Sequence, residues 1–224
     1  MRVALCLHGQ PRFFEQTYKY FFSNLIEGLH ADVYFHSWWS NKMIGSLYPC
    51  AIHAKHALSD EDMLVREDIP DKLIELYKPM DYLFEDYDIF RPTFDKPNYF
   101  QYYTQWQVGQ LMRERYDLVI RSRFDLMCTQ DIEIVQDNNV WIPSCCPYTD
   151  GRVNDMFSIS NHDNFLRISE TFLNLKIFEE DGKGDMEWAL ASQIEKEKLS
   201  IKTFKADYST FDILRSDTAK KYPI

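Results

Sequence analysis

The sequence has few glycines, few cysteines and no long apolar run. Its 224 residues include 7 glycines and 5 cysteines. The apolar stretch at residues 3–7 is too short for the hydrophobic core of a signal peptide, and no later run reaches the length of a membrane span. We therefore expect a chain without a secretion signal of its own and without a membrane span.

The cysteines do not have the spacing of a disulfide framework. Their number is odd, no C-x-x-C pair is present, and Cys145 and Cys146 are adjacent, which rarely allows a disulfide. We expect reduced thiols in a cytosol-like compartment. A structural zinc site is the less favoured alternative, because the spacings do not match the usual zinc patterns.

Positive charge is also scarce. The chain carries 25 lysines and arginines against 35 acidic residues, a formal net charge of −10. Such a chain is poorly suited to bind a nucleic-acid backbone or an anionic membrane surface, so we expect neither as a main partner. A local group of arginines in an acidic chain is therefore informative, because it indicates a small anionic ligand.

Residues 116–126, with the sequence YDLVIRSRFDL, join a core strand to a run of charges. Residues 117–120 predict a central strand that is buried on both faces. Arg121, Arg123 and Asp125 follow at alternate positions, so in a strand they would point to one side. Arginine suits phosphate, and a carboxylate can hold a divalent ion that bridges to the same phosphates. A metal diphosphate is one predicted ligand, and a salt-bridge ladder on an exposed strand end is the alternative.

The rest of the chain alternates between strand and helix patterns. It predicts a single α/β domain over residues 1–215, with a mixed, mostly parallel central sheet flanked by helices, and a tail over residues 216–224 that could begin a linker. The expected strands are residues 2–7, 32–36, 81–85, 117–120, 131–135, 139–143, 156–160 and 201–204, and the expected helices are residues 13–29, 71–77, 98–115, 163–178 and 185–198.

The turn after the first strand is a candidate nucleotide site. It contains His8, Gly9, Gln10 and Arg12 and leads directly into a helix, as nucleotide-binding halves of α/β sheets do. Gly9 could let the backbone approach a base or ribose, and Arg12 could reach a phosphate. A plain strand-to-helix turn stays open as the alternative, because the G-x-G-x-x-G signature is absent.

Two further groups lie where the same crevice is expected. His36 ends the second strand, where it could bind a ligand or be a core histidine, and Trp38 and Trp39 follow it. The two tryptophans are either core, which is favoured, or a stacking surface for a base or sugar ring. Gln101 and Tyr103 belong to the first turns of the helix at residues 98–115 and could face the crevice.

Four blocks, at residues 3–12, 32–38, 116–126 and 154–157, resemble in this order the GT-A class of nucleotide-sugar glycosyltransferases. They are similar to bacterial and viral polysaccharide glycosyltransferases, and most similar to the amino-terminal domain of the chlorovirus family that glycosylates the major capsid protein. The resemblance covers most of the chain. It implies a Rossmann-like GT-A fold, a UDP-sugar donor, a glycan acceptor on a glycoprotein or polysaccharide, and a cytoplasmic location, in the host cell if the source is viral.

The resemblance also implies Mn2+ or Mg2+ between the diphosphate and an Asp-x-Asp motif. This chain has Arg123-Phe124-Asp125 at that place, so only Asp125 carries over as a metal ligand, and Arg123 could partly replace the missing carboxylate by its charge. The metal and Arg121 or Arg123 would stabilise charge on the UDP leaving group.

Asp155 and Glu187 are the candidate catalytic residues. Asp155 opens a strand near the same sheet edge and is expected to contact the acceptor or the donor sugar. Glu187 is the second choice, and its alternative role is to favour the dipole of the helix that it begins. An inverting enzyme would need one of them as a base, whereas the resemblance suggests retention, which requires no such base.

We therefore expect a metal-dependent hexosyltransferase that uses a UDP-sugar, with UDP-rhamnose and UDP-glucose as candidates, in capsid-protein or surface-polysaccharide glycosylation. One alternative is a UDP- or sugar-binding module without catalysis, which the missing first aspartate keeps open. Another is a nucleotidyltransferase, for which a glycine-rich loop and basic residues for a triphosphate would be expected; the sequence shows neither.

Overall fold

The computed structural model describes residues 1–48, 58–94, 96–130, 132, 134–144, 150–206, 211–215 and 220–221. The strands are β1 Val3–Gly9, β2 Asp32–Trp38, β3 Asp81–Glu85, β4 Leu118–Arg123, β5 Leu126–Cys128, β6 Val140–Pro143, β7 Phe157–Ser160, β8 Ile201–Phe204 and β9 Phe211–Ile213. The helices are α1 Phe14–Thr17, α2 Ser23–Leu29, α3 Asp60–Met63, α4 Ile69–Tyr77, α5 Tyr87–Phe90, α6 Pro97–Leu111, α7 His162–Ser169, α8 Thr171–Glu180 and α9 Met186–Lys196. A π-helical turn, Tyr18–Phe22, joins α1 to α2, and a 3₁₀ turn covers Asn41–Met43.

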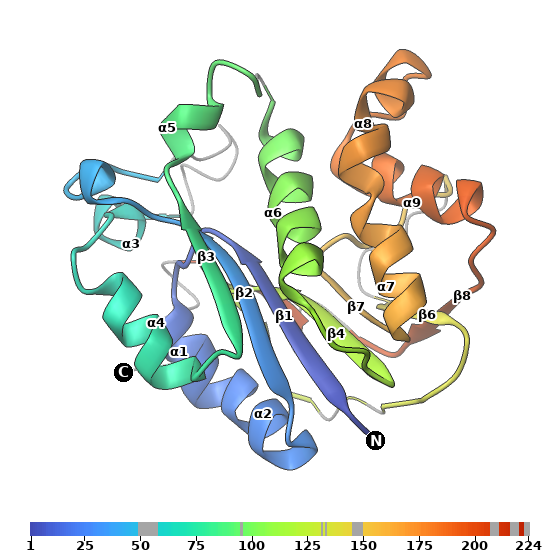
Figure 1. Ribbon diagram of the computed structural model, residues 1–224, viewed down its shortest axis with the longest axis horizontal. Helices are drawn as coiled ribbons and strands as arrows, with labels where there is room; N and C mark the ends of the chain where they lie inside the picture. Colours follow the sequence, from blue (N-terminus) through green and yellow to red (C-terminus); the bar gives the residue numbers. More distant parts are fainter. Residues whose placement is uncertain are drawn as a thin grey trace.

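Seven of these strands form one sheet in the order β3-β2-β1-β4-β7-β6-β8 (Figure 1). The first four are parallel, β7 runs antiparallel to β4 and β6, and β6 and β8 are parallel. The prediction of a mixed, mostly parallel sheet in a single domain is confirmed. So is the central place of β4, which has three strands on each side.

Helices cover both faces of this sheet (Figure 1). Ala4 and Cys6 of β1 pack with Val108 of α6, with Met112 just after that helix, and with Phe165 of α7. The alternate residues of the same strand belong to the cluster on the opposite face. Both faces of the strand are therefore apolar, which is why residues 3–7 of β1 read as a continuous apolar run rather than an alternating one.

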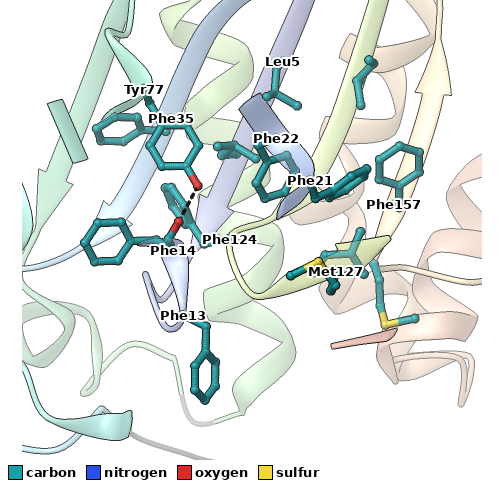
Figure 2. Packing of buried hydrophobic residues seen from close by; sticks show 14 of the residues in the cluster. Leu5, Phe13, Phe14, Phe21, Phe22, Phe35, Tyr77, Phe124, Met127 and Phe157 are labelled. Carbon is teal, nitrogen blue, oxygen red and sulfur yellow. Dashed lines mark hydrogen bonds between the residues drawn. The ribbon is translucent and has the colours of Figure 1, made fainter. Parts of the chain in front are cut away.

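The opposite face is packed mainly by aromatic rings (Figure 2). Phe14, Phe21 and Phe22 come from the helical segment that follows β1, and Tyr77 comes from α4. The Tyr77 ring meets Phe124 edge to face at 6.0 Å between centroids, and its hydroxyl donates to the Phe14 carbonyl at 3.0 Å. This contact ties α4 to the first helical turn.

Three expectations about local structure are wrong. The described residues 132, 134 and 135 form no strand; the strand in this region is β5, which pairs with β9 in a separate two-stranded sheet. The helix expected over residues 163–178 is two helices, α7 and α8, with Glu170 between them. Asp125 is not on the central strand, because β4 ends at Arg123 and Asp125 lies in the turn before β5.

Several other expectations can be followed only in part. Cys6 and Cys128 are buried free thiols, whereas Cys50, Cys145 and Cys146 lie outside the described residues. The predicted tail at residues 216–224 is described only at Lys220 and Lys221, so the boundary at residue 215 stays a prediction. Within the described part of the chain, no helix has both the length and the apolar character needed to cross a membrane.

Candidate functional site

The parallel strands bring the predicted polar residues to one edge of the sheet. His8 on β1 pairs in register with His36 on β2 and with Arg123 on β4. Because parallel strands end at the same edge, the turn after β1 and the end of β4 lie together there. This is the edge at which open α/β sheets bind ligands.

A cavity of about 800 Å³ opens at this edge, between the strand ends, the start of α6 and the α8–α9 loop. The predicted site residues that line it are His8, Gly9, Gln10, Arg12, Gln101, Arg123 and Glu187. The other predicted site residues, which are not among the lining residues, are His36, Tyr103, Arg121, Asp125 and Asp155.

The backbone of the turn after β1 directs Arg12 into the site. Gly9 has φ 100°, a conformation that residues with a side chain rarely adopt. Phe13 has φ 54°, which costs a non-glycine residue about 1–2 kcal/mol. These two residues with positive φ flank the segment that carries Arg12, whose Nη2 donates to Asp125.

Asp125 binds two arginines. Its Oδ1 accepts from Arg123 Nε at 2.8 Å, and its Oδ2 accepts from Arg123 Nη2 at 2.8 Å and from Arg12 Nη2 at 2.6 Å. Burial acts to raise the pKa of Asp125, but the charges and hydrogen bonds of Arg123 and Arg12 outweigh it and hold that pKa far below its usual value. The carboxylate is therefore ionised and paired.

Arg121 shares a face of β4 with Arg123 but not its surroundings. Its side chain is buried, and Nε donates to Ser158 Oγ at 2.9 Å. Neither Nη1 nor Nη2 has a hydrogen-bond partner among the described residues. Burial lowers the pKa of Arg121 despite the nearby Asp155. The Arg121 guanidinium is therefore buried and does not line the cavity.

Asp155 is connected to the cavity by Gln101. The Gln101 amide nitrogen donates to Asp155 Oδ2, and Gln101 lines the cavity whereas Asp155 is 7% exposed. Asp155 is thus placed to orient Gln101. Its predicted contact with a sugar stays a prediction, and in this structure Gln101 stands between the two.

His36 and Tyr103 belong to a buried group around Glu85. His36 Nε2 lies 2.7 Å from Glu85 Oε2, and the Tyr103 hydroxyl donates to Glu85 Oε1 at 3.2 Å. Burial lowers the pKa of His36, although the hydrogen bond to Glu85 acts in the opposite direction. These positions match the core-histidine alternative for His36.

His8, in contrast, lines the cavity. Its Nδ1 lies 3.3 Å from Thr104 Oγ1, and its Nε2 has no partner among the described residues. Burial, together with the charges of Arg121 and Arg123, lowers the pKa of His8 well below its usual value. The imidazole is therefore neutral near pH 7 and can donate or accept one hydrogen bond.

Of the acidic residues that line the cavity, only Glu187 was predicted from the sequence. Glu179 and Asp185 line it with Glu187, and all three come from the α8–α9 region. Glu179 accepts from Lys96 Nζ at 2.9 Å, and Asp185 caps α9 by accepting from the Trp188 amide at 2.8 Å. The glycines of the α8–α9 loop, Gly182 and Gly184, were the one feature of the sequence that could have indicated a binding loop here.

An aromatic wall completes the cavity. Trp38, Tyr87 and Phe100 line it, and Trp38 is also 2% exposed and stacked on Tyr103 with centroids 5.8 Å apart. The core assignment favoured for Trp38 is therefore confirmed, and part of its ring also bounds the cavity. Trp39 is only partly buried and donates to the Arg66 carbonyl.

The residues of this site do not fit the implied Mn2+ or Mg2+. Both oxygens of Asp125 already accept hydrogen bonds from guanidiniums, and Asp125 does not line the cavity. No group of three or more His, Cys, Asp or Glu side chains in the described part of the chain could hold a metal ion. The metal role of Asp125 stays a prediction, and this arrangement argues against it.

No family model and no curated protein matches the sequence. Among solved structures, the chain is similar to glycosyltransferase GlyE of Streptococcus pneumoniae TIGR4, with 14% identity, a TM-score of 0.50, and coverage of 90% of this chain and 46% of that one. It is also similar to the CTP:phosphocholine cytidylyltransferase LicC of Streptococcus pneumoniae, with 10% identity, a TM-score of 0.53, and coverage of 99% and 97%. A nucleoside-diphosphate-sugar pyrophosphorylase of Vibrio cholerae RC9 gives 8% identity, a TM-score of 0.53, and coverage of 98% of each chain.

At these identities the likeness shows the fold alone. That fold is the Rossmann-like one of GT-A glycosyltransferases and nucleotidyltransferases, as the sequence resemblance implied. The chain spans about half the length of GlyE.

Proposed function

We propose that this protein is a glycosyltransferase that moves a sugar from a UDP-sugar to a glycan acceptor. The observation that carries the proposal is that one cavity combines arginines from one part of the chain with carboxylates from another. Arg12 and Arg123 come from the strand ends, whereas Glu179, Asp185 and Glu187 come from the α8–α9 region. The cavity is large enough for a nucleotide sugar, since ligand pockets of about 300–1,000 Å³ hold drug-sized molecules.

Each part of a UDP-sugar has a chemical counterpart in the cavity. Guanidinium groups bind the diphosphate through paired hydrogen bonds. Carboxylates accept hydrogen bonds from sugar hydroxyls. The rings of Trp38, Tyr87 and Phe100 offer apolar surface to a base.

The acidic residues receive different roles. Glu187 lines the cavity and is the first candidate to contact a sugar hydroxyl. Asp155 acts through Gln101, which it holds in position. We favour a retaining reaction, in which the leaving UDP oxygen, and not a protein base, takes the proton of the acceptor hydroxyl. The arginines then stabilise the charge that develops on the UDP leaving group.

The finer assignments rest on the sequence resemblance alone. They are UDP-rhamnose or UDP-glucose as the donor, and a capsid-protein glycan or surface polysaccharide as the acceptor. The predicted Mn2+ or Mg2+ has no complete set of ligands among the described residues, so no step of the proposal depends on it.

The test is release of UDP from a panel of UDP-sugars, with and without glycan acceptors, for the wild type and Glu187→Gln. The matched control is Glu195→Gln, on the same helix but outside this cavity, with a side chain that is 79% exposed. We expect Glu187→Gln to lower kcat/KM by about tenfold or more, because a hydrogen bond to a charged group contributes about 1.5–3 kcal/mol. The control should stay within twofold. UDP binding without turnover of any sugar would favour a binding module, and no UDP binding would refute the proposal.

A further inference from the structure

We infer that Asp125 is the counter-ion that fixes Arg12 and Arg123, and that this arginine pair binds the donor diphosphate without a metal ion on Asp125. The inference rests on the proposed function for the identity of the ligand. It goes beyond that function because it changes the role of the one residue of the Asp-x-Asp motif that this chain retains.

The carboxylate of Asp125 already accepts hydrogen bonds from two guanidiniums. Arg123 binds both oxygens of Asp125, with two distances of 2.8 Å, and Arg12 adds a third bond at 2.6 Å. The fork of a guanidinium matches a carboxylate in this paired geometry. The Asp125 side chain is 2% exposed, so its oxygens face the guanidiniums and not the cavity.

The two positive charges of this group lie nearer the cavity than the negative one. Arg12 and Arg123 line the cavity, and Asp125 lies behind them. A divalent ion on Asp125 would displace an arginine from an oxygen and would lie beside two guanidinium cations. Like charges so close in a buried site repel each other strongly. A diphosphate in the cavity, by contrast, would contact the guanidiniums of Arg12 and Arg123 directly.

The two arginines come from distant parts of the sequence. Arg123 stands where the first carboxylate of an Asp-x-Asp motif would be, and it binds Asp125 two residues along the chain. Arg12 binds the same carboxylate from 113 residues away, and its buried Nε has no hydrogen-bond partner among the described residues. Two independent segments therefore converge on one carboxylate and leave cationic groups at the wall of the cavity.

The experiment is calorimetric titration of UDP into the whole chain in EDTA, Mn2+ and Mg2+. The variants are Arg12→Met, Arg123→Met and Asp125→Asn. Arg115→Met is the control, because its side chain is 72% exposed and pairs with Asp163 away from the cavity. We expect the Kd of the wild type to agree within threefold in the three conditions. Each cavity arginine variant should weaken binding at least tenfold, and the control less than twofold.

Thermal melts report whether each variant is folded. If an arginine variant does not fold, the wild type and Asp125→Asn decide the question, together with direct Mn2+ titration followed by electron paramagnetic resonance. We expect Asp125→Asn to bind UDP more weakly than the wild type but with the same Kd in EDTA and in Mn2+. We also expect the wild type and the variant to have the same affinity for Mn2+.

Two outcomes would overturn the inference in distinguishable ways. UDP binding that is lost in EDTA, restored by Mn2+ in the wild type and not restored in Asp125→Asn would make Asp125 a metal ligand, and the glycosyltransferase proposal would stand. Absence of UDP binding in every condition would remove the proposed donor, and the inference would fail with it.

Discussion

Replacing Asp125 by asparagine should destabilise the folded protein considerably. The change keeps the shape of the side chain but removes the charge that Arg12 and Arg123 share, and the side chain of Arg12 is only 9% exposed. Removing one partner of a buried ion pair costs about 3–5 kcal/mol, because the other charge is left uncompensated. For a chain of this size each kcal/mol lowers Tm by about 2–4 °C, so we expect a fall of roughly 6–20 °C.

The pH dependence of this effect follows from the pKa of Asp125. The folded-state pKa is below the unfolded-state value of about 3.9, so the contribution to stability is complete above that value and is lost as the pH falls toward the folded-state pKa. The difference in unfolding free energy between the wild type and Asp125→Asn should be constant from about pH 5 to pH 8, by the same linkage. Below about pH 4 it should shrink.

Urea unfolding followed by tryptophan fluorescence measures this difference, with EDTA present so that no metal contributes. Asp163→Asn is the control, since it removes an ion pair with Arg115 whose side chains are 52% and 72% exposed. Such exposed pairs contribute about 0–1 kcal/mol. A cost for Asp125→Asn no larger than that of the control, or a difference that stays constant into acid, would refute the ion-pair reasoning.

Three further predictions concern a buried hydrogen bond, a tightly packed glycine and a buried thiol. Tyr77→Phe loses the hydroxyl bond to the Phe14 carbonyl, which also accepts from another hydroxyl, so urea unfolding should show a cost of about 0.5–1.5 kcal/mol. Gly184→Ala places a Cβ against Glu179 Cγ and 3.0 Å from the Glu179 Cα, and a melt should show a loss of about 1–3 kcal/mol from overpacking. Burial raises the pKa of the Cys6 thiol, so peptide mapping should find it unlabelled by a thiol reagent at about pH 8 in the folded protein and labelled in urea; labelling at equal rates would contradict its burial.

The central part of the fold was predictable because burial on two faces leaves a plain signal. Residues 117–120 are apolar at successive positions, and β4 is the middle strand of the sheet. The β3 strand reads as less apolar, and it lies at the sheet edge. In both cases the hydrophobic pattern follows directly from the number of faces that the strand buries.

Short and interrupted elements were not predictable in this way. β5 and β9 are three residues each and pair across a long sequence separation, so neither carries a periodic pattern of its own. Residues 163–178 keep helical spacing on both sides of Glu170, and the break between α7 and α8 leaves no mark in that spacing. Tertiary packing decides such boundaries.

The candidate site was predicted in outline but not in its contacts. The alternation of Arg121 and Arg123 correctly placed both on one face of β4. It could not show that Arg121 is buried beside Ser158 while Arg123 reaches the cavity. Glu179 and Asp185 were missed, because a carboxylate near a helix end carries no mark of the cavity that it faces.

The fixed position of Arg12 and Arg123 explains how an acidic protein could bind a dianionic donor. Asp125 lies behind Arg12 and Arg123, and the turn with Gly9 and Phe13 fixes the chain on one side of them. Their side chains are therefore held before a ligand arrives, and less conformational entropy is lost on binding than with flexible surface lysines. A metal ion supplies charge, but it must itself be bound and positioned. A fixed pair of guanidiniums supplies charge and geometry together, which is why the loss of Asp125 should weaken UDP binding through the arginines and not through an ion.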